Sequence, residues 1–367
     1  MPPIAFTDLA QSLPATVPFV GPETQERMME RAFLARLGAN ESLFGPSPRA
    51  VQAMAQAARN VWMYGDPENH DLRHALAAHH GVQPENIVVG EGIDGLLGYL
   101  VRLLVGAGDH VVTSNGAYPT FNFHVAGFGG QLHRVDYSDD HEDPVALAHA
   151  ANSTGAKLLY FANPDNPMGT WHGADVVQTL INDTPAGTVL VLDEAYIDTA
   201  PTGTAPAIDV TRENIIRMRT FSKAYGMAGL RVGYAIGHEA LISAFHKVRN
   251  HFGVGRIQQA GALAALHDQA YLQATVQNIK TARAALADVG RKHGLSPLPS
   301  ATNFVTFECG RDGDYARALL DKLIAKGIFV RMPAVPPMDR CIRVSVPDAP
   351  GLALFDAALG EILASGA

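Results

Sequence analysis

The residues most able to do chemistry in this chain lie close together in the segment 220–231. Lys223 follows two small hydroxyl residues and precedes a glycine-rich run, and Arg231 lies eight residues further on. The hydroxyl groups of Thr220 and Ser222, together with an arginine, are donors of the kind that bind a phosphate group. A lysine that is buried near a cation has a lowered pKa, and its neutral amine can act as a nucleophile or a base. The segment therefore suits a lysine that works beside a phosphorylated cofactor.

Polar residues at the ends of two apolar runs are the next candidates. Asp193 follows the apolar run 189–192, so we expect its carboxylate at the exit of a buried strand, poorly solvated unless a cation pairs with it. Its alternative role is to cap the helix that follows. Tyr196 lies three residues further on. Asn166 lies in a proline-flanked turn over 163–169, where it is either a hydrogen-bond donor to a ligand or part of an ordinary Asx turn.

A glycine-rich motif raises a rival hypothesis. The segment 90–95, Gly-Glu-Gly-Ile-Asp-Gly, matches G-x-G-x-x-G between an expected strand and an expected helix, as in a dinucleotide-binding fingerprint. That fingerprint needs an acidic residue after the next strand, but Ser-Asn-Gly follows the expected strand 110–113, and Asp109 precedes it. A nucleotide-dependent oxidoreductase is therefore a distant alternative. The same turn can still bind a phosphate through the backbone N–H groups of Ile93 and Asp94.

The composition narrows the class of partner. There are 28 Lys and Arg against 36 Asp and Glu, a formal net charge of −8, so nothing favours nucleic-acid binding. The 2 cysteines make neither a disulfide framework nor a metal spacing, which favours a reducing, cytoplasmic compartment. We expect no signal peptide, and no apolar stretch reaches the roughly 18 residues of a membrane span. The densest histidines, His74, His79 and His80, lack a carboxylate or cysteine at ligand spacing, so we expect no metal site.

Short apolar runs alternate with helical patterns over most of the chain. The runs lie at 86–90, 110–113, 157–162, 188–192, 215–219 and 232–236. After the first run, leucines recur at helical spacing up to residue 104. This alternation predicts an α/β fold with a mostly parallel sheet covered by helices on both faces. Ligands bind such sheets beyond the carboxyl ends of the strands, and the candidate residues fall there.

The pattern changes after residue 255, where a smaller α+β domain is expected. Its expected elements are a long helix at 268–293, strands at 303–308, 328–331 and 341–346, and a closing helix at 351–363. We therefore divide the 367 residues into an N-terminal arm (1–39), a large cofactor-binding domain (40–255) and a small C-terminal domain (256–367). The arm is expected to contain one short helix, at 23–34, and to pack with the small domain.

Taken in order along the chain, these motifs resemble those of the pyridoxal-phosphate (PLP) enzymes of the aspartate-aminotransferase superfamily (class I/II), most closely the histidinol-phosphate aminotransferase branch. The resemblance covers nearly the whole chain, and it implies the PLP-dependent transferase fold of the aspartate-aminotransferase type. It implies that Lys223 is the Schiff-base lysine and also moves the substrate's α-proton. It further implies that Asp193 pairs with the pyridine nitrogen, and that Tyr196 and Asn166 bind the ring oxygen.

The resemblance also implies the remaining contacts of cofactor and substrate. The cofactor phosphate would be bound by Gly92, Ile93, Asp94, Thr220, Ser222 and Arg231. Phe121 matches the aromatic residue that stacks on the pyridine ring, and Tyr64 matches a tyrosine that reaches the cofactor of the neighbouring subunit, which implies a homodimer. The substrate-binding residues would be Arg343, Arg331, Asn40 and Phe19.

The activity that the resemblance implies is transfer of an amino group from an amino acid or a histidinol-phosphate-like amine to 2-oxoglutarate, by a ping-pong mechanism. A PLP-dependent decarboxylase of a phosphorylated amino acid shares the same motifs and is the main alternative. Three residues depart from the family pattern: Phe19 replaces a tyrosine whose hydroxyl helps to hold the substrate phosphate, Met168 replaces a threonine, and Gly95 replaces an acid. We therefore expect a weaker site for the substrate phosphate, or preference for another anionic donor.

Overall fold

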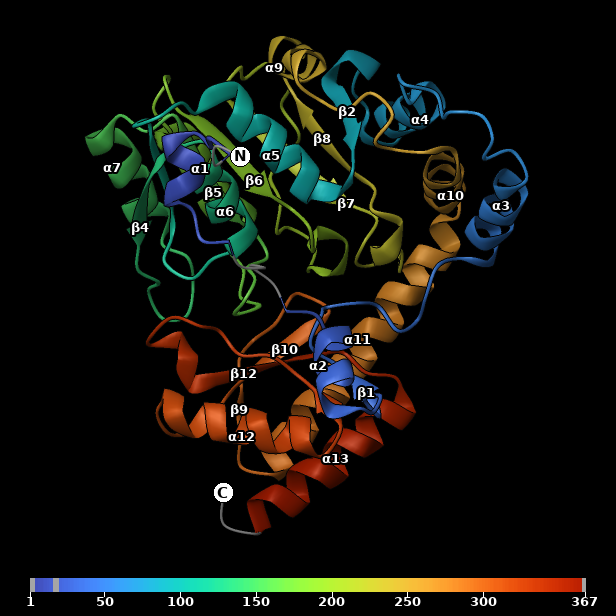
Figure 1. Cartoon of the computed structure of the whole chain (residues 1–367), viewed down its shortest axis with the longest axis vertical. Helices are drawn as coiled ribbons and strands as arrows, with labels where there is room; N and C mark the ends of the chain where they lie inside the picture. Colours follow the sequence, from blue (N-terminus) through green and yellow to red (C-terminus); the bar gives the residue numbers. More distant parts are fainter. Residues whose placement is uncertain (1–3, 16–19, 365–367) are drawn as a thin grey trace.

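The computed structural model describes residues 4–15 and 20–364. Its largest feature is a seven-stranded sheet between helices, with a smaller group of strands and helices beside it (Figure 1). The seven strands are β2 (Ile87–Gly90), β3 (His110–Ser114), β4 (Gln131–Val135), β5 (Leu158–Ala162), β6 (Val189–Asp193), β7 (Ile215–Thr220) and β8 (Gly233–Gly237). Their order across the sheet is β2-β8-β7-β6-β5-β3-β4.

Neighbouring strands of this sheet run parallel, except that β8 is antiparallel to both β2 and β7. The prediction of an α/β fold with a mostly parallel sheet is confirmed. The sequence analysis missed β4, which forms the end of the sheet beside β3. None of its side chains is fully buried, so it lacks the continuous apolar run by which the buried strands were predicted.

Alternate side chains of the central strands lie on opposite faces, and each face has its own helices. Leu158 and Val191 pack in one core with α5 (Gly92–Leu104), α6 (Pro119–Gly127) and α9 (Glu239–Ala244). Leu159 and Leu190 pack in another core with α7 (Pro144–Thr154) and α8 (Ala174–Asp183). Because successive residues of a strand point to opposite faces, a strand covered on both sides is apolar along its whole length.

The end of the sheet that carries β2 and β8 has a third core. It joins these strands to α3 (Pro48–Ala58), α4 (His70–His80) and α10 (Arg256–Leu266). α4 ends at Gly81, whose φ of 68° is the left-handed conformation that glycine adopts without strain at the end of a helix. His79 and His80 therefore lie in the last turn of this helix.

The C-terminal part forms the smaller layer. Its antiparallel sheet contains β9 (Ser296–Pro297), β10 (Phe304–Glu308) and β12 (Cys341–Ser345). A common core joins β10 and β12 to α11 (Gln269–Lys292), α12 (Gly313–Ala325) and α13 (Ala349–Ala364). The expected long helix and the expected strands around residues 305 and 343 therefore form, with bounds shifted by one residue.

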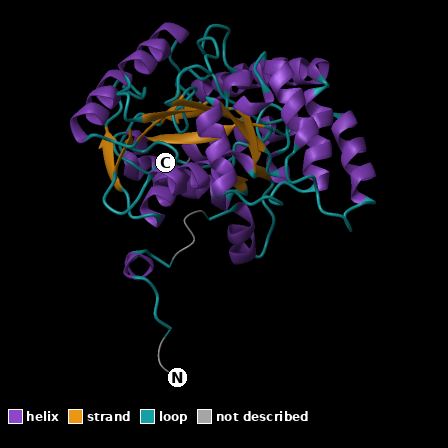
Figure 2. Ribbon diagram, turned by 90° about the horizontal axis from the view of Figure 1, so that it is seen from above, coloured by secondary structure: helices purple, strands orange, loops and turns teal. Residues whose placement is uncertain are grey.

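Residues 34–37, which precede Asn40, join this smaller layer. β1 (Ala35–Arg36) pairs in parallel with β11 (Ile328–Phe329), and Leu37 lies in the same core. α2 (Pro22–Met29) is shorter than expected because Glu30 adopts a left-handed conformation, with φ 54°. α1 (Asp8–Ser12) lies at the outside of the fold in Figure 2, and its Leu9 side chain lies near Gly129, between α6 and β4, and not on the smaller layer. The division of the chain at residues 39 and 255 stays our proposal.

Short 3₁₀ turns connect several of these elements, at Pro84–Asn86, Ile197–Thr199, Ala228–Leu230, Phe245–Lys247 and Met338–Arg340. None of the helices within residues 4–15 and 20–364 is long and apolar enough to cross a membrane. In the same ranges, no group of three or more His, Cys, Asp or Glu side chains is placed to hold a metal ion.

Candidate active site

Lys223 lies in the loop that follows β7, at the carboxyl end of the parallel strands. Its Nζ donates a hydrogen bond to the backbone carbonyl of Asn40 at 3.1 Å and lies 5.5 Å from the centre of the Tyr196 ring. Removal of the amine from water, and then the nearby cations Arg343 and Arg231, lower the pKa of Lys223 to about 8. Both effects disfavour the charged amine, so its neutral form is far more populated near pH 7 than in an exposed lysine.

The first turn of α5 and the start of β8 form a narrow cradle. Gly92 has a φ of 75°, and a Cβ on it would lie 2.5 Å from Nη2 of Arg231. A Cβ on Gly233 would lie 2.8 Å from the backbone nitrogen of Ile93. Only glycine leaves this space free, and the N-terminus of a helix together with an arginine is a binding site for an anion.

Two hydroxyl groups complete the cradle. Ser222 Oγ accepts a hydrogen bond from Nη1 of Arg231 at 3.3 Å and from Oγ1 of Thr220 at 2.8 Å. The carboxylate of Asp94, in the first turn of α5, is 3.0 Å from Nε2 of His124 on α6. The structure thus brings together the residues predicted to hold a phosphate. Because the Asp94 carboxylate pairs with His124, the predicted phosphate contact of Asp94 is its backbone amide.

Asp193 is the last residue of β6, and its carboxylate is buried. Oδ2 accepts a hydrogen bond from the Tyr160 hydroxyl at 2.6 Å, and Oδ1 accepts one from the N–H of Ala195 at 2.9 Å. The second bond caps the turn that follows, as the alternative interpretation predicts. Burial nevertheless raises the pKa of Asp193, and a buried carboxylate is stabilised by a nearby cation. The position suits a partner such as a protonated ring nitrogen.

Tyr196 and Asn166 reach the same region from neighbouring loops. The hydroxyl of Tyr196 accepts a hydrogen bond from Nδ2 of Asn40 at 3.0 Å, and burial raises the pKa of Tyr196. Oδ1 of Asn166 accepts a hydrogen bond from Nη1 of Arg343. Asn40, which the resemblance predicts to bind the substrate, thus lies beside Tyr196 although the two are far apart in sequence.

The two predicted substrate arginines lie side by side. The backbones of Arg331 and Arg343 form an isolated antiparallel bridge, and Arg343 Nη2 donates to the carbonyl of Gly38 at 3.2 Å. Arg331 donates to the carbonyl of Val20. Burial lowers the pKa of Arg343 to about 10, so it stays charged at neutral pH. Arg343 therefore presents a cation close to the lysine, the arrangement that an anionic amino donor requires.

Phe121, the aromatic residue predicted to stack on the cofactor ring, packs in the core beside the large sheet. The ring of Phe121 is 0% exposed and stacks on Tyr160, with 4.7 Å between ring centres. Tyr118, the N-cap of α6, is only partly buried, and burial together with the charge of Asp94 raises its pKa to about 12. The charge of Asp193 also acts on the phenol of Tyr118, which the sequence analysis did not single out. The stacking role of Phe121 stays a prediction.

Tyr64 does not join this chain's own site. It is 79% exposed, and its ring lies 4.8 Å from that of Phe252, which is also exposed. A tyrosine that serves a second copy of the chain would be placed in this way, so its role stays a prediction. Phe19 lies outside the described residues, and its role also stays a prediction.

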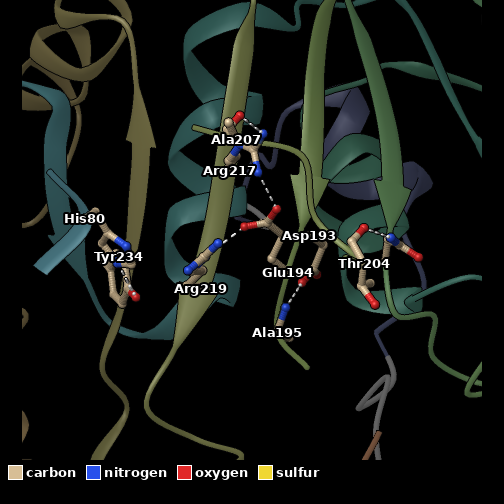
Figure 3. A network of polar contacts seen from close by, with 10 residues as sticks. His80, Asp193, Glu194, Ala195, Thr204, Ala207, Arg217, Arg219 and Tyr234 are labelled. Carbon is tan, nitrogen blue, oxygen red and sulfur yellow. Dashed lines mark hydrogen bonds and ion pairs between the residues drawn. The ribbon is translucent and has the colours of Figure 1, made fainter. Parts of the chain in front are cut away.

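A buried ion network holds the strand end that carries Asp193. The carboxylate of Glu194 accepts from Nη1 of Arg217 and from Nε of Arg219, both at 2.8 Å, and these arginines come from the neighbouring strand β7 (Figure 3). Arg217 also donates to the carbonyl of Ala207 at 2.9 Å. A buried carboxylate with two charged donors has little freedom to move. The network therefore fixes the backbone from which Asp193 projects.

A second buried pair supports the loop that carries Asn166. Glu142 Oε2 accepts from the Ser114 hydroxyl at 2.6 Å and Oε1 from the N–H of Ala162 at 3.1 Å. Glu142 also hydrogen-bonds Asp165, which accepts from the Tyr137 hydroxyl at 2.8 Å. Burial, and then the charge of Asp165, hold the pKa of Glu142 well above its usual range. Glu142 therefore keeps its proton and shares it with Asp165.

We expect the free energy of unfolding to fall less with rising pH in the Glu142→Gln variant than in the unmodified protein. Burial raises the pKa of Glu142, and it raises that of Asp165 to about 6, so the pair stabilises the fold fully below about pH 4. This contribution is lost as the pH rises through the folded-state values, because the unfolded chain gives up its protons first. Glutamine does not ionise, so the free energy of unfolding should fall less between about pH 5 and pH 8, by about 1–2 kcal/mol.

Urea unfolding at the two pH values measures this difference. Glu213→Gln, at an exposed position, is the matched control and should behave like the unmodified protein. An equal fall in stability in the Glu142→Gln variant and the unmodified protein would show that Glu142 is ionised in the folded state.

The fold and the site together define a class of protein. An amine of lowered pKa, a buried carboxylate and a glycine-lined anion cradle meet at the carboxyl edge of a mostly parallel sheet. These residues fit PLP: the cradle can hold its phosphate, Asp193 its ring nitrogen, and Lys223 its aldehyde carbon. The class is that of the α/β enzymes that use PLP.

Comparisons with known proteins give the family. The model of the family "Aminotransferase class I and II" matches residues 34–352. The histidinol-phosphate aminotransferase of Moorella thermoacetica is 33% identical over 333 residues, which cover 90% of this chain and 85% of that protein. The one of Roseiflexus castenholzii is 36% identical over 320 residues, covering 85% of each chain.

A solved structure agrees with these relatives. The crystal structure of histidinol-phosphate aminotransferase from Sinorhizobium meliloti in complex with pyridoxal-5'-phosphate has 53% sequence identity and a TM-score of 0.96, and the match covers 99% of this chain and 98% of that one. The chain therefore belongs to the class I and II aminotransferase family and is a PLP-dependent aminotransferase that acts on small molecules.

Proposed function

We propose that this aminotransferase moves the amino group of histidinol phosphate, or of a closely similar anionic amine, to 2-oxoglutarate. The observation that carries the proposal is the pair of arginines beside the lysine: Arg343 acts electrostatically on both Lys223 and Tyr196, and Arg331 bridges to Arg343 through the backbone. Its relatives from Moorella thermoacetica and Roseiflexus castenholzii are histidinol-phosphate aminotransferases, which supports the same donor.

The chain's own residues divide the work. Bound PLP supplies an electron sink for the carbon that loses its proton. The Lys223 amine, whose lowered pKa of about 8 leaves part of it neutral near pH 7, takes that proton and returns it, as a base of pKa near neutrality should. Asp193 would hold the ring nitrogen, Tyr196 and Asn166 would hold the ring oxygen, and Arg343 would bind the donor's anionic group. An amine and an oxo acid then use the same site in turn, which is a ping-pong sequence.

With a suitable donor, consumption of the amine is expected to require an oxo acid. Each donor molecule should yield one glutamate from 2-oxoglutarate, because the amino group has no other acceptor. A panel containing histidinol phosphate, aromatic amino acids and aspartate, assayed for glutamate, tests both the reaction and the donor. Release of carbon dioxide from a phosphorylated amino acid without any oxo acid would instead establish the decarboxylase alternative.

We also propose that the enzyme is a homodimer. Trp62 and Tyr64 are 80% and 79% exposed, and Val61 and Phe252 are exposed as well. Arg256 donates to the carbonyl of Tyr64 at 2.8 Å, so this apolar surface is held in place and not left loose. A second copy that covered it would bring Tyr64 toward the partner's cofactor phosphate. A cytoplasmic location stays a prediction from the cysteine content.

A further inference from the structure

Asn40 is the residue at which three parts of the chain meet. Its carbonyl accepts from Lys223 Nζ at 3.1 Å, and its side-chain amide donates to the Tyr196 hydroxyl at 3.0 Å. Its backbone is left-handed, with φ 54°. That conformation is uncommon for residues other than glycine, although asparagine adopts it more readily than most. The groups that hold Asn40 in it therefore determine where its carbonyl points.

Two buried residues of the smaller layer hold Asn40. Asn303, just before β10, donates from Nδ2 to the same carbonyl at 3.0 Å. Ser345, the last residue of β12, accepts from the Asn40 N–H at 2.8 Å and donates to Asn40 Oδ1 at 3.3 Å. They are 1% and 2% exposed. The N–H of Val346 donates to the Asn303 carbonyl at 2.8 Å, so the two residues are tied to each other as well.

The carbonyl of Asn40 is shared between two donors. A carbonyl oxygen has two lone pairs, so it can accept from Asn303 and from Lys223 at once. The bond from Asn303 fixes the direction of the oxygen, and the bonds to Ser345 fix the rest of the residue. Neither Asn303 nor Ser345 has a hydrogen bond to Lys223, so an effect on the lysine passes through the segment that contains Asn40 and Glu41.

We propose that Asn303 and Ser345 are positioning residues that act through Asn40 to set where the Lys223 amine rests when it is not joined to the cofactor. The proposal rests on the role of Lys223 in the proposed function. It makes the position of the amine, on a loop of the large sheet, depend on strands β10 and β12 of the smaller layer.

If Asn303 and Ser345 had a purely structural role, replacing them would lower the stability of the fold but would not change the pKa of the Lys223 amine. Asn303 also donates to the carbonyl of Glu41 at 3.3 Å, so it anchors this segment in any case. The charged groups that act on Lys223 are Arg343 and Arg231, which lower its pKa, and Glu41 and Asp193, which raise it. A carbonyl that accepts from the amine favours the charged form. Without a fixed carbonyl, burial and the arginines act with less opposition, and the pKa of Lys223 should fall further.

The test measures that pKa directly. Asn303→Leu removes the amide donor at similar volume, and Ser345→Ala removes the hydroxyl. The full chain, purified without cofactor, is labelled with acetic anhydride over a range of pH, and the label on the Lys223 peptide is measured by mass spectrometry. Only the neutral amine reacts, so the midpoint reports the pKa. We expect both midpoints to fall, by an amount that corresponds to a roughly three- to tenfold change in the ionisation equilibrium.

Two matched variants separate this effect from a general loss of structure. Thr188, just before β6, also donates a buried hydrogen bond to a backbone carbonyl, that of Ala156, at 2.6 Å. Thr188→Val removes this bond and should leave the labelling midpoint of Lys223 unchanged. Ser345→Thr keeps the hydroxyl, so the labelling midpoint of Lys223 should also stay unchanged. Unchanged midpoints in Asn303→Leu and Ser345→Ala, or an equal shift in Thr188→Val, would overturn the proposal. If Asn303→Leu does not fold, Ser345→Ala decides alone.

Turnover gives the second readout. We expect Asn303→Leu to lower kcat about tenfold with KM little changed, because a displaced amine affects the proton transfer more than donor binding. The labelling midpoints do not need turnover. If no donor is converted by the unmodified enzyme, the proposed function fails while the midpoints still test Asn303 and Ser345. If the variants keep normal turnover and unchanged labelling midpoints, the proposed function stands and only the positioning role of Asn303 and Ser345 is contradicted.

Discussion

Replacing Lys223 with alanine is expected to lower turnover by about 10⁴-fold or more. It should also remove the visible absorbance that PLP shows when it is joined to a lysine. The reason is that one amine serves both as the covalent attachment of the cofactor and as the base that moves the proton, and a positioned base alone contributes up to about 10⁴-fold. The low pKa of Lys223, about 8, suits both tasks. Steady-state kinetics and an absorbance spectrum of the purified variant measure the two effects.

Lys280→Ala is the matched control, because Lys280 lies exposed on α11. It should keep both the spectrum and the turnover of the unmodified enzyme. Binding of PLP itself should persist in Lys223→Ala, since the cradle of Gly92, Ser222 and Arg231 remains. A Lys223→Ala enzyme that kept normal turnover would end the assignment of this lysine.

Replacing Asp193 with asparagine is expected to lower kcat by about 10²-fold or more with a smaller change in KM. Asparagine keeps the size of the side chain and can still accept from the N–H of Ala195, so the turn stays capped. It loses the negative charge that would stabilise a protonated ring nitrogen as charge builds up during reaction. The loss should therefore fall on the chemical step.

The stability of the cofactor-free protein separates the two roles of Asp193. Burial raises the pKa of Asp193 in the folded chain, so ionisation costs stability as the pH rises through that value. Asp193→Asn should therefore be at least as stable as the unmodified protein near neutral pH without PLP, although its affinity for PLP falls. Asp209→Asn, in a surface turn, is the control. An unchanged kcat in folded Asp193→Asn protein would show that the carboxylate serves only as a cap.

The order of the elements and most of the predicted cofactor residues follow from local patterns. Strands covered on both faces must be apolar throughout, which is why β5 and β6 were predicted from short apolar runs. The polar residues that end those runs must then lie at one edge of the sheet. Lys223 and Arg231 belong to one short segment, so the hairpin-like return from β7 to β8 brings them together without any distant contact. The exposed strand β4 had no such pattern and was missed.

Only the tertiary structure decided which residues complete the site. Phe121 and Tyr118 lie three residues apart, and the packing of Phe121 against Tyr160 buries the first, whereas the second is only partly buried. Asn303 bonds Asn40 across 263 residues of sequence, and no local pattern predicts a contact at that range. The sequence determined the residues whose role depends on their own strand or turn. The residues whose role depends on the meeting of two layers were set by packing, because which buried donor faces which acceptor depends on how the whole chain folds.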